Sequence, residues 1–441
     1  MRFLGIGEYC DLAAMYLRIA NAGHDVKVYV KNPDYQGIYK GMLKFTKHWK
    51  NELKWIKKAG KDGVIIFESA TNGILQDELR SQGFQVIGGS AFGDQLEANR
   101  DFGQQTMHQI GMRVATSHAF KSYEAAIAFV ENAKNRYVFK NNGADTLRTK
   151  NYVGMLEDGS DLIALLELYR NQYRASKSKL KPDFVLMEYV SGIEVGIGAF
   201  FNGVSFLKPA CLDWEHKRFF TGNLGELTGE MGTVVTYRGA EIIFNLSLAG
   251  LESKLRESGY CGYINLNMIA NKKGLWPLEF TSRFGYPGFS ICGALHKEEW
   301  ESIFVKMLNR SDTHLKTFSG FATGVVLTVP PFPYRYGYAE LSKGAPIMLD
   351  PSLTEKDKEL IDLSEVEKLH GSLITSGVTG CIATAIGRGN TVKSACKKAY
   401  KLAAKIVVPN VRYRLDIGND LMNGDLTQLI SWGYLNEADP L

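Results

Sequence analysis

The first 90 residues alternate between short apolar runs and amphipathic stretches. Apolar runs rich in β-branched residues occur at RFLGIG (2–7), VKVYV (26–30), GVIIFES (63–69) and QVIGG (85–89). Strands separated by helical segments are typical of a parallel sheet with helices on its faces. We therefore expect residues 1–90 to form a Rossmann-like α/β domain.

The turn after the first apolar run is rich in glycine. Gly5 and Gly7 stand where a strand passes into a helix, which is the position of a phosphate-binding loop in nucleotide-binding folds. The third glycine of a dinucleotide fingerprint would fall at Cys10, and no acidic residue ends VKVYV to hold a ribose hydroxyl. Both interpretations stay open, and the residues favour a plain tight turn over a nicotinamide site.

Composition and the N-terminus exclude several classes of protein. Of 441 residues, 45% are hydrophobic and 22% are charged, which is typical of a globular protein of about three domains. No run approaches the roughly 18 consecutive apolar residues that span a bilayer, and Glu8 and Asp11 interrupt the apolar N-terminus, unlike a signal peptide. The six scattered cysteines lack a CxxC pair, which favours a cytoplasmic location and argues against a zinc cluster.

The segment Lys40–Lys61 is strongly basic, although the net charge of +5 is too weak to indicate nucleic acid by itself. It holds eight lysines against one acid, Glu52. Its apolar residues have helical spacing, so we expect a helix that packs through Met42, Phe45, Trp49, Leu53 and Ile56. A solvated basic face is the simpler interpretation, and a docking surface for a polyanion such as nucleic acid is the sharper one.

The pattern changes twice along the remaining chain. Residues 91–316 mix strands and helices, and YINLNMIA and LWPLEF flank the turn NKKG as a hairpin. Residues 317–425 have the pattern of a small, separate α+β module, and residues 426–441 that of a peripheral tail. We therefore expect a multidomain protein of mixed α/β and α+β class.

Two segments carry residues suited to a nucleotide. Lys140 ends the strand YVFK before a polar loop, where a lysine can reach phosphates as a point charge. In MEYVSGIE a strand passes into a turn that holds Glu188 and Glu194, which can offer backbone groups to adenine and a carboxylate to ribose. Each segment alone is also what an ordinary surface strand presents.

Two further segments carry residues suited to anions and metal ions. Glu279, Thr281 and Arg283 alternate along LWPLEFTSRFG, and Asn267 lies on the preceding strand. Such oxygen ligands can hold Mg²⁺, and the arginine can bind a carboxylate, although a surface ion pair is the simpler interpretation. The glycine-rich DWEHKRFFTGNLGELTGEMGT can bring backbone amides to an anionic substrate, or it can be a mobile surface loop.

In this order, the segments resemble the phosphoribosylamine–glycine ligase family of the ATP-grasp superfamily, over nearly the whole chain. QLEANRDF is similar to the helix before the ATP-grasp domain, YVFKNNG to the lysine strand and MEYVSGIE to the adenine and ribose strand. EHKRFFTGNLGELTGEMG resembles the HKR…TGGMG loop, and PLEFTSRFGYP resembles the metal strand EFNxRFGDPE. GCIATAIGRGNTVKSACKKAYKLAAKI with YRLDIG is similar to the closing module.

The resemblance implies a domain organisation and an activity. The domains would be Rossmann-like (1–90), ATP-grasp (91–316, with a lid at about 117–190) and a C-terminal module (317–425), before the tail (426–441). The implied activity is that of a ligase of purine biosynthesis that uses ATP and Mg²⁺ to activate glycine or another small amino acid as an acyl phosphate. An amine then attacks, and an amide, ADP and phosphate are released.

Family positions also imply site residues. The implied catalytic residues are Arg283 and Lys140. The implied ATP contacts are Lys140, Lys150, Glu188, Tyr189, Val190 and Glu194. The implied metal ligands are Glu279, Thr281 and Asn267. The implied substrate loop contributes His216, Lys217, Arg218, Gly229, Met231 and Gly232.

The chain departs from the family pattern most clearly where the amine acceptor would bind. GxGGREHAL, which handles phosphoribosylamine in the family, is GIGEYCDLA here, and the strand end GPE is FES, around Glu68. TLRTKN replaces the glycine flap AGKG, so Arg148 or Lys150 would act there through a side chain. Thr281 replaces the asparagine of the metal strand, and Tyr286 the aspartate after RFG.

Three functions are compatible with these residues. The family reaction is the leading interpretation. A ligase that uses a different amine, such as one on a modified nucleotide or nucleic acid, fits the altered N-terminus and the lysines of Lys40–Lys61. A non-catalytic nucleotide-binding protein on the same scaffold fits the changed flap and Thr281.

Overall fold

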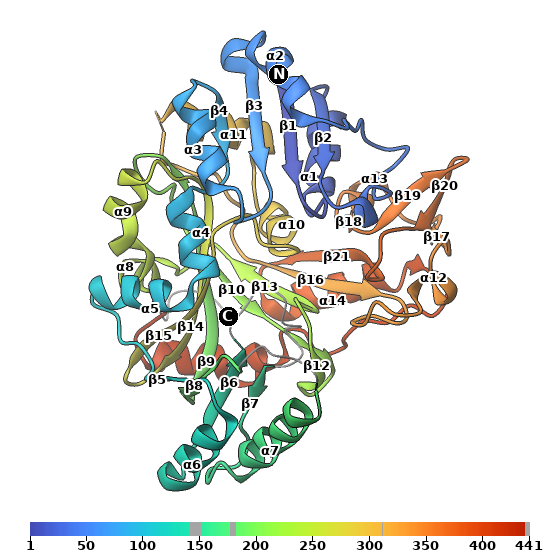
Figure 1. The fold of residues 1–441 in the computed structure, drawn as a ribbon. Helices are drawn as coiled ribbons and strands as arrows, with labels where there is room; N and C mark the ends of the chain where they lie inside the picture. Colours follow the sequence, from blue (N-terminus) through green and yellow to red (C-terminus); the bar gives the residue numbers. More distant parts are fainter. Residues whose placement is uncertain (142–150, 177–181, 311, 437–441) are drawn as a thin grey trace.

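A four-stranded parallel sheet forms one end of the molecule (Figure 1). The computed structural model describes residues 1–141, 151–176, 182–310 and 312–436. The strands pair in the order β2-β1-β3-β4. They are β1 (Arg2–Gly7), β2 (Asp25–Val30), β3 (Gly63–Phe67) and β4 (Gln85–Ile87), with helices α1 (Ala13–Asn21) and α3 (Gly73–Ser81) between them. The expected Rossmann-like arrangement of the N-terminal segment is confirmed.

The glycines of β1 are required by close packing. A Cβ atom on Gly5 would lie 2.4 Å from the ring of Tyr16, and one on Gly7 would lie 2.1 Å from a carboxylate oxygen of Glu68. Both distances are too short for real atoms, so only glycine fits at these two positions. The structure thus supports the interpretation of a tight, packed turn.

The segment Lys40–Lys61 does not form the continuous helix that its spacing suggests. Only η2 (Trp49–Glu52), α2 (Leu53–Lys57) and η3 (Gly60–Asp62) are helical. Before them the chain runs beside the edge strand β2, where the Val28 N–H donates to the carbonyl of Lys44 at 2.9 Å and the Thr46 N–H to that of Val28 at 2.9 Å. Hydrogen bonding to the open edge of the sheet therefore determines the conformation of this segment, although its apolar residues have helical spacing. All eight lysines are nevertheless exposed.

A long antiparallel sheet fills the centre of the molecule (Figure 1). Its strand order is β15-β14-β9-β10-β13-β16-β21-β18. The strands from the middle of the chain are β9 (Ile193–Asn202), β10 (Cys211–Glu215), β13 (Gly232–Thr236), β14 (Cys261–Asn271) and β15 (Gly274–Thr281). Helices α4 (Ala91–Ala98), α5 (Arg100–Gln109), α8 (Glu241–Asn245), α9 (Glu252–Glu257), α10 (Gly288–Gly293) and α11 (Trp300–Asn309) belong to the same part of the chain. The expected hairpin around NKKG is the β14–β15 pair.

A smaller sheet lies at the end of the molecule opposite the parallel sheet (Figure 1). Its order is β5-β8-β6-β7, and helices α6 and α7 pack on it with a hydrophobic cluster of their own. The elements are β5 (Ser117–Phe120), α6 (Tyr123–Ala133), β6 (Tyr137–Asn141), β7 (Tyr152–Val153), α7 (Ser160–Ala175) and β8 (Phe184–Glu188). A body with its own core can move relative to the long sheet, as a lid would.

The C-terminal segment, expected from the sequence as a small α+β module, shares the long sheet with the middle of the chain. Its strands β16 (Phe321–Thr328), β18 (Ile361–Leu363) and β21 (Cys381–Gly389) continue the long sheet, and β16 pairs with β13 along five residues of each strand. A second sheet, β19-β20-β17-β22, lies beside them. The remaining elements are α12 (Tyr338–Leu341), β17 (Pro346–Leu349), α13 (Glu355–Lys358), β19 (Val366–Leu369), β20 (Ser372–Thr375), α14 (Val392–Ala403) and β22 (Ile406–Val407).

The tail is also less peripheral than expected. Leu426 and Leu429, on α15 (Leu426–Ser431), are buried in the main hydrophobic cluster. The Tyr434 hydroxyl donates to the carbonyl of Asn271 at 2.9 Å, which fixes the tail to the β14–β15 turn. These two leucines are three residues apart on one helix and pack into the core, whereas the sequence analysis expected the tail to be peripheral. In the described part of the chain, no helix is both long and apolar enough to cross a membrane.

Candidate active site

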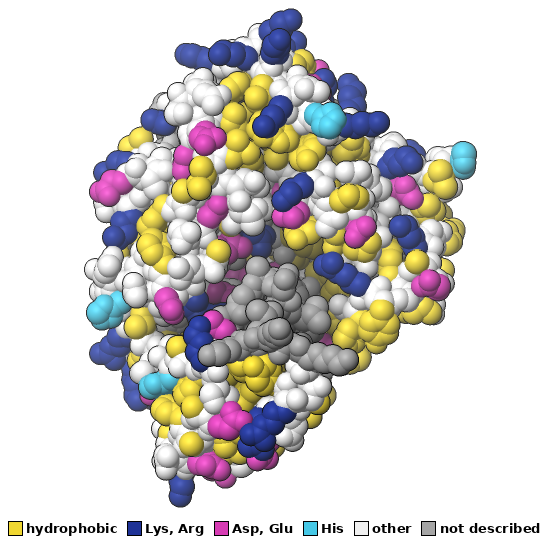
Figure 2. Space-filling model, in the orientation of Figure 1, with side chains coloured by type: hydrophobic (Ala, Val, Ile, Leu, Met, Phe, Trp, Pro, Cys, Tyr) yellow, Lys and Arg dark blue, Asp and Glu magenta, His cyan; other side chains and the backbone are white. Residues whose placement is uncertain are grey.

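A cavity of about 810 Å³ opens over the long sheet. Figure 2 shows acidic and basic side chains gathered around the hollow in the middle of this face. Six of the residues proposed from the sequence line it, namely Lys217, Gly229, Asn267, Glu279, Thr281 and Arg283. The volume is within the range of about 300–1,000 Å³ that small-molecule sites have.

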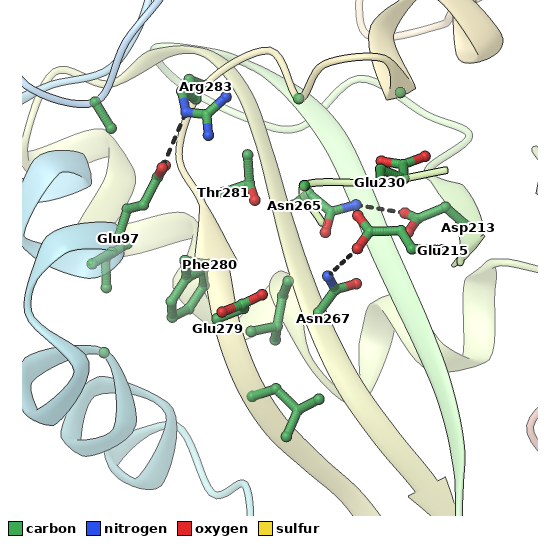
Figure 3. A pocket seen from close by; sticks show the side chains of 18 of the residues that line it. Glu97, Asp213, Glu215, Glu230, Asn265, Asn267, Glu279, Phe280, Thr281 and Arg283 are labelled. Atoms are coloured by element: carbon green, nitrogen blue, oxygen red, sulfur yellow. Dashed lines mark hydrogen bonds and ion pairs between the residues drawn. The ribbon is translucent and has the colours of Figure 1, made fainter. Parts of the chain in front are cut away.

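The floor of the cavity is one face of the sheet. In β14 and β15, Asn267 pairs with Glu279 and Asn265 pairs with Thr281. Residues two apart on a strand point to the same face, so these four polar side chains form a small patch. Figure 3 shows them directed into the cavity. The placement of Asn267 opposite Glu279 agrees with the hairpin expected from the sequence.

Two glycines of β9 bring side chains of its neighbouring strands together. β9 lies between β14 and β10, with Gly196 beside Asp213 and Gly198 beside Asn265. A Cβ atom on Gly196 would lie 2.1 Å from a carboxylate oxygen of Asp213. Because no side chain fills this furrow, the Asn265 amide reaches across β9 and donates to Asp213 at 2.5 Å (Figure 3).

Lys217 stands at the centre of the charged groups. Its Nζ lies 2.8 Å from a carboxylate oxygen of Glu194, 3.2 Å from one of Glu215 and 3.2 Å from one of Glu279. Burial alone would lower the pKa of Lys217, but the three carboxylates outweigh burial and hold the pKa well above its ordinary value. Lys217 therefore stays charged and joins three strands and a loop at one point.

Lys140 belongs to the same electrostatic group. Burial and the like charge of Arg100 lower its pKa to about 8, against the opposing effect of Glu279. A lysine whose charge is only partly compensated is well suited to receive an anion. Arg100, at the start of α5, lines the cavity and was not singled out in the sequence.

Arg283 is held at the other end of the floor. Its Nε donates to Glu97 of α4 at 3.0 Å, and the Ser282 N–H donates to the second oxygen of the same carboxylate at 2.7 Å (Figure 3). Burial opposes its charge, but Glu97 and Asp11 raise the pKa of Arg283 further above its ordinary value. Glu97, within QLEANRDF, thus orients the arginine, and the ion pair Glu279–Arg283 considered from the sequence is replaced by Glu97–Arg283.

Several residues expected in the substrate loop lie away from the cavity. Burial lowers the pKa of His216 to about 4, and its Nε2 accepts the N–H of Gly418 at 3.1 Å. Met231 and Gly232 are buried. Arg218 lies on the hairpin of β11 (Arg218–Phe220) and β12 (Leu224–Leu227) and donates to the Gly225 carbonyl at 2.7 Å. None of these four residues is among those that line the cavity.

The expected adenine segment joins the lid-like sheet to the long sheet. Glu188 ends β8 and is exposed, while Tyr189 and Val190 follow it and are half-buried. The Tyr189 ring stacks under the guanidinium of Arg136 at 3.6 Å. None of these three residues is among those that line the cavity. Lys150 and Arg148 lie outside the described residues.

Besides Arg100, the polar cavity residues that the sequence interpretation missed include Asp213, Glu215, Glu230 and Asn265. The signal was present as alternation, because LDWE and NLN place polar residues at every second position of otherwise apolar strands. Glu230 stands in the glycine-rich loop, at the place of the second glycine in TGGMG.

The β1–α1 turn holds a carboxylate of the protein itself. Glu68, which is buried at the end of β3, accepts the N–H of Asp11 at 2.9 Å. Backbone amides at the start of a helix are also the groups that bind a phosphate. Burial and the nearby charge of Asp11 raise the pKa of Glu68 to about 8. The turn is thus filled from within the chain.

The donor set at the floor fits Mg²⁺ bound together with a polyphosphate. Glu279, Asn267 and Thr281 offer carboxylate, amide and hydroxyl oxygens, which are the ligand types that Mg²⁺ prefers. In the described residues, no cluster of three or more acidic, histidine or cysteine side chains could hold a metal ion alone. Magnesium in nucleotide sites typically takes one or two carboxylates and completes its shell with phosphates and water.

Comparison with known proteins identifies the scaffold. Residues 98–289 match the family model described as phosphoribosylglycinamide synthetase, ATP-grasp (A) domain. Over these residues the chain resembles the ATP-grasp domain of glycinamide ribonucleotide synthetases. The chain is 25% identical to the phosphoribosylamine–glycine ligase of Clostridium acetobutylicum over 381 residues, which cover 83% of the chain and 86% of the relative. The corresponding enzyme of Streptococcus suis is 25% identical over 395 residues, 86% and 87% of the two chains.

Solved structures show the same fold. The crystal structure of phosphoribosylamine–glycine ligase from Thermotoga maritima superposes on this chain with a TM-score of 0.69 at 23% identity, covering 95% of this chain and all of the other. The biotin carboxylase domain of a 2-oxoglutarate carboxylase from Hydrogenobacter thermophilus, solved with MgADP, superposes with a TM-score of 0.63 at 12% identity, covering 93% and 91%.

Proposed function

We propose that the chain is an ATP-dependent carboxylate–amine ligase that activates glycine or another small amino acid as an acyl phosphate. The observation that carries the proposal is the floor of the cavity. There, Lys217 and Arg283 lie with Glu279, Asn267 and Thr281, on a scaffold shared with phosphoribosylamine–glycine ligases. Cations beside oxygen ligands are what an in-line phosphoryl transfer requires.

Each group has a proposed task. Lys140 and Lys217 offset the charge of the ATP phosphates, and Glu188 to Val190 with Glu194 hold the nucleoside. Mg²⁺, bound through Glu279, Thr281 and Asn267, would neutralise charge on the transferred phosphoryl group. Arg283, fixed by Glu97, binds the substrate carboxylate or the acyl phosphate. The domain bounds 1–90, 91–316 and 317–425 are proposed on the same basis.

The decisive experiment is ADP release from Mg·ATP, with glycine and freshly generated phosphoribosylamine omitted in turn. ADP formation that requires both supports the family reaction. Dependence on glycine alone supports a ligase with another amine. No ADP with any pair, but tight Mg·ATP binding, supports a non-catalytic nucleotide-binding protein.

A different amine acceptor is the second candidate. Two features favour a different amine. Glu68 fills the β1–α1 turn, where a phosphate would otherwise bind. The exposed lysines of Lys40–Lys61 present a basic surface. We propose that this surface contacts a polyanion such as nucleic acid. A polynucleotide added to the same assay at low salt should then raise turnover or bind with strong salt dependence.

The pKa of Lys140 gives a prediction on pH. In the empty site its pKa is about 8, so at pH 8 about half of the molecules carry a neutral lysine. A bound polyphosphate favours the charged form and raises this pKa, so ATP binding at pH 8 should take up to about half a proton, and ATP affinity should fall above pH 8. Calorimetry in two buffers of different ionisation enthalpy measures the uptake. Equal uptake by Lys140→Gln would contradict the assignment.

A further inference from the structure

One end of the cavity is more acidic than phosphate binding requires. Asp213 and Glu230 line it beside Glu215, which is the only one of the three whose carboxylate lies within ion-pair distance of Lys217 among the described residues. Figure 3 shows the three carboxylates on the side of the cavity opposite Arg283. In the described part of the chain, Asp213 and Glu230 therefore form no ion pair, and the charge of Lys217 acts on them only from a greater distance.

Three buried polar atoms of residues that line this end have no hydrogen-bond partner in the described residues. Asp213 is only 6% exposed; one carboxylate oxygen accepts from Asn265, and Oδ1 has no hydrogen bond within the described residues. Thr233 of β13 is 1% exposed, and its hydroxyl also has none there. An oxygen of Glu230 is in the same situation. Unpaired buried polar groups are costly, so each indicates a missing partner.

A hydrogen-bond donor with positive charge fits these groups. Burial, then the Glu215 and Asp213 carboxylates, raise the pKa of Glu230 well above its ordinary value, and burial with Glu215 raises that of Asp213 to about 8, although Lys217 opposes both shifts. Both groups therefore favour the protonated form in the empty site, and a bound cation would stabilise their charged form. An ammonium group also supplies the N–H donors that the unpaired oxygens of Asp213, Glu230 and Thr233 lack.

We propose that this end of the cavity, the Asp213 subsite, binds an alkylammonium group of a substrate through Asp213 and Glu230, with the Thr233 hydroxyl beside them. The ammonium belongs either to the amino acid that is activated or to the amine that accepts it. The inference rests on the proposed ligase activity. It states that the amine is recognised through its positive charge at the floor of the cavity, and that this recognition does not require a phosphate group on the amine.

Equilibrium binding tests the subsite without turnover. Titration calorimetry in the presence of Mg²⁺ and a non-hydrolysable ATP analogue would compare glycine, propylammonium and glycolate, which keeps the carboxylate that Arg283 is proposed to bind but has no ammonium group. Propylammonium should bind, or glycine should bind about tenfold or more tightly than glycolate. A preference for glycine alone places the amino acid at the subsite, whereas binding of propylammonium places the acceptor there. Equal binding of glycine and glycolate without binding of propylammonium would overturn the proposal.

Substitutions locate the binding. Asp213→Asn and Glu230→Gln should each weaken the ammonium probe about tenfold or more, because the buried charge that faces the ammonium is lost. Asp62→Asn, at an exposed position that does not line the cavity, is the matched control and should leave binding unchanged. Retained affinity for the ATP analogue shows that each variant is folded. Unchanged ammonium binding in both variants would refute the subsite, even if the ligase activity were established.

Discussion

Replacement of Glu279 by glutamine is expected to lower the rate of ADP formation about 100-fold or more. Glutamine keeps the size of the side chain but removes the charged oxygens that we propose as ligands of Mg²⁺. The rate should partly recover at high Mg²⁺ concentration, because the remaining oxygens of Asn267 and Thr281 still face the site. Initial rates of ADP release measured against Mg²⁺ concentration check this prediction.

A matched control distinguishes the loss of the Glu279 charge from a general effect of a Glu→Gln substitution on folding. Glu257→Gln makes the same change on an exposed position of α9 and should leave the rate unaltered. The Glu279→Gln protein should also keep its melting temperature within a few degrees, since Glu279 is partly exposed. A Glu279→Gln protein with full activity and an unchanged Mg²⁺ requirement would show that the metal lies elsewhere.

Replacement of Arg283 by methionine should lower kcat by about 100- to 1,000-fold and change ATP affinity little. The guanidinium is held by Glu97 and lines the cavity, whereas the expected nucleoside contacts Glu188 to Val190 are not among the lining residues. Its proposed task begins only when a carboxylate or acyl phosphate is present. Steady-state kinetics with the ATP and amino-acid concentrations varied separately, together with direct measurement of ATP binding, check the split between kcat and ATP affinity.

The arginine prediction has two internal checks. Arg283→Lys keeps the charge but not the planar fork, so it should recover only part of the lost rate. Arg113→Met, at an exposed surface position, should behave like the unchanged protein. A loss confined to ATP affinity would instead assign Arg283 to the nucleotide.

Much of the floor could be predicted from the sequence because it depends on strand periodicity. Glu279 and Thr281 were assigned to one face of a strand and Asn267 to its hairpin partner, and the register of β14 and β15 confirms this geometry. Their roles as ligands stay a proposal. The parallel order of the first four strands was also expected, because alternating strands and helices leave few other arrangements.

The rest depended on contacts between distant segments. Asp213 and Asn265 are 52 residues apart and meet only because the intervening strand, β9, has glycine where a side chain would separate them. Likewise, the spacing of Lys40–Lys61 is helical, but the edge of β2 captures the first part of this segment as extended chain. A local sequence pattern cannot predict which edge of a sheet is open or which strand lies between two others.

The pairing of β13 with β16 decides how the molecule can be divided. A fragment cut at residue 316, where the sequence suggests a boundary, would lose the neighbour of GTVVT along its whole length. An uncovered strand rich in β-branched residues is a template for pairing with other chains. The cavity and the C-terminal segment therefore form one cooperative unit, and the part of the chain that binds ATP should aggregate, not function, when it is expressed without residues 317–425.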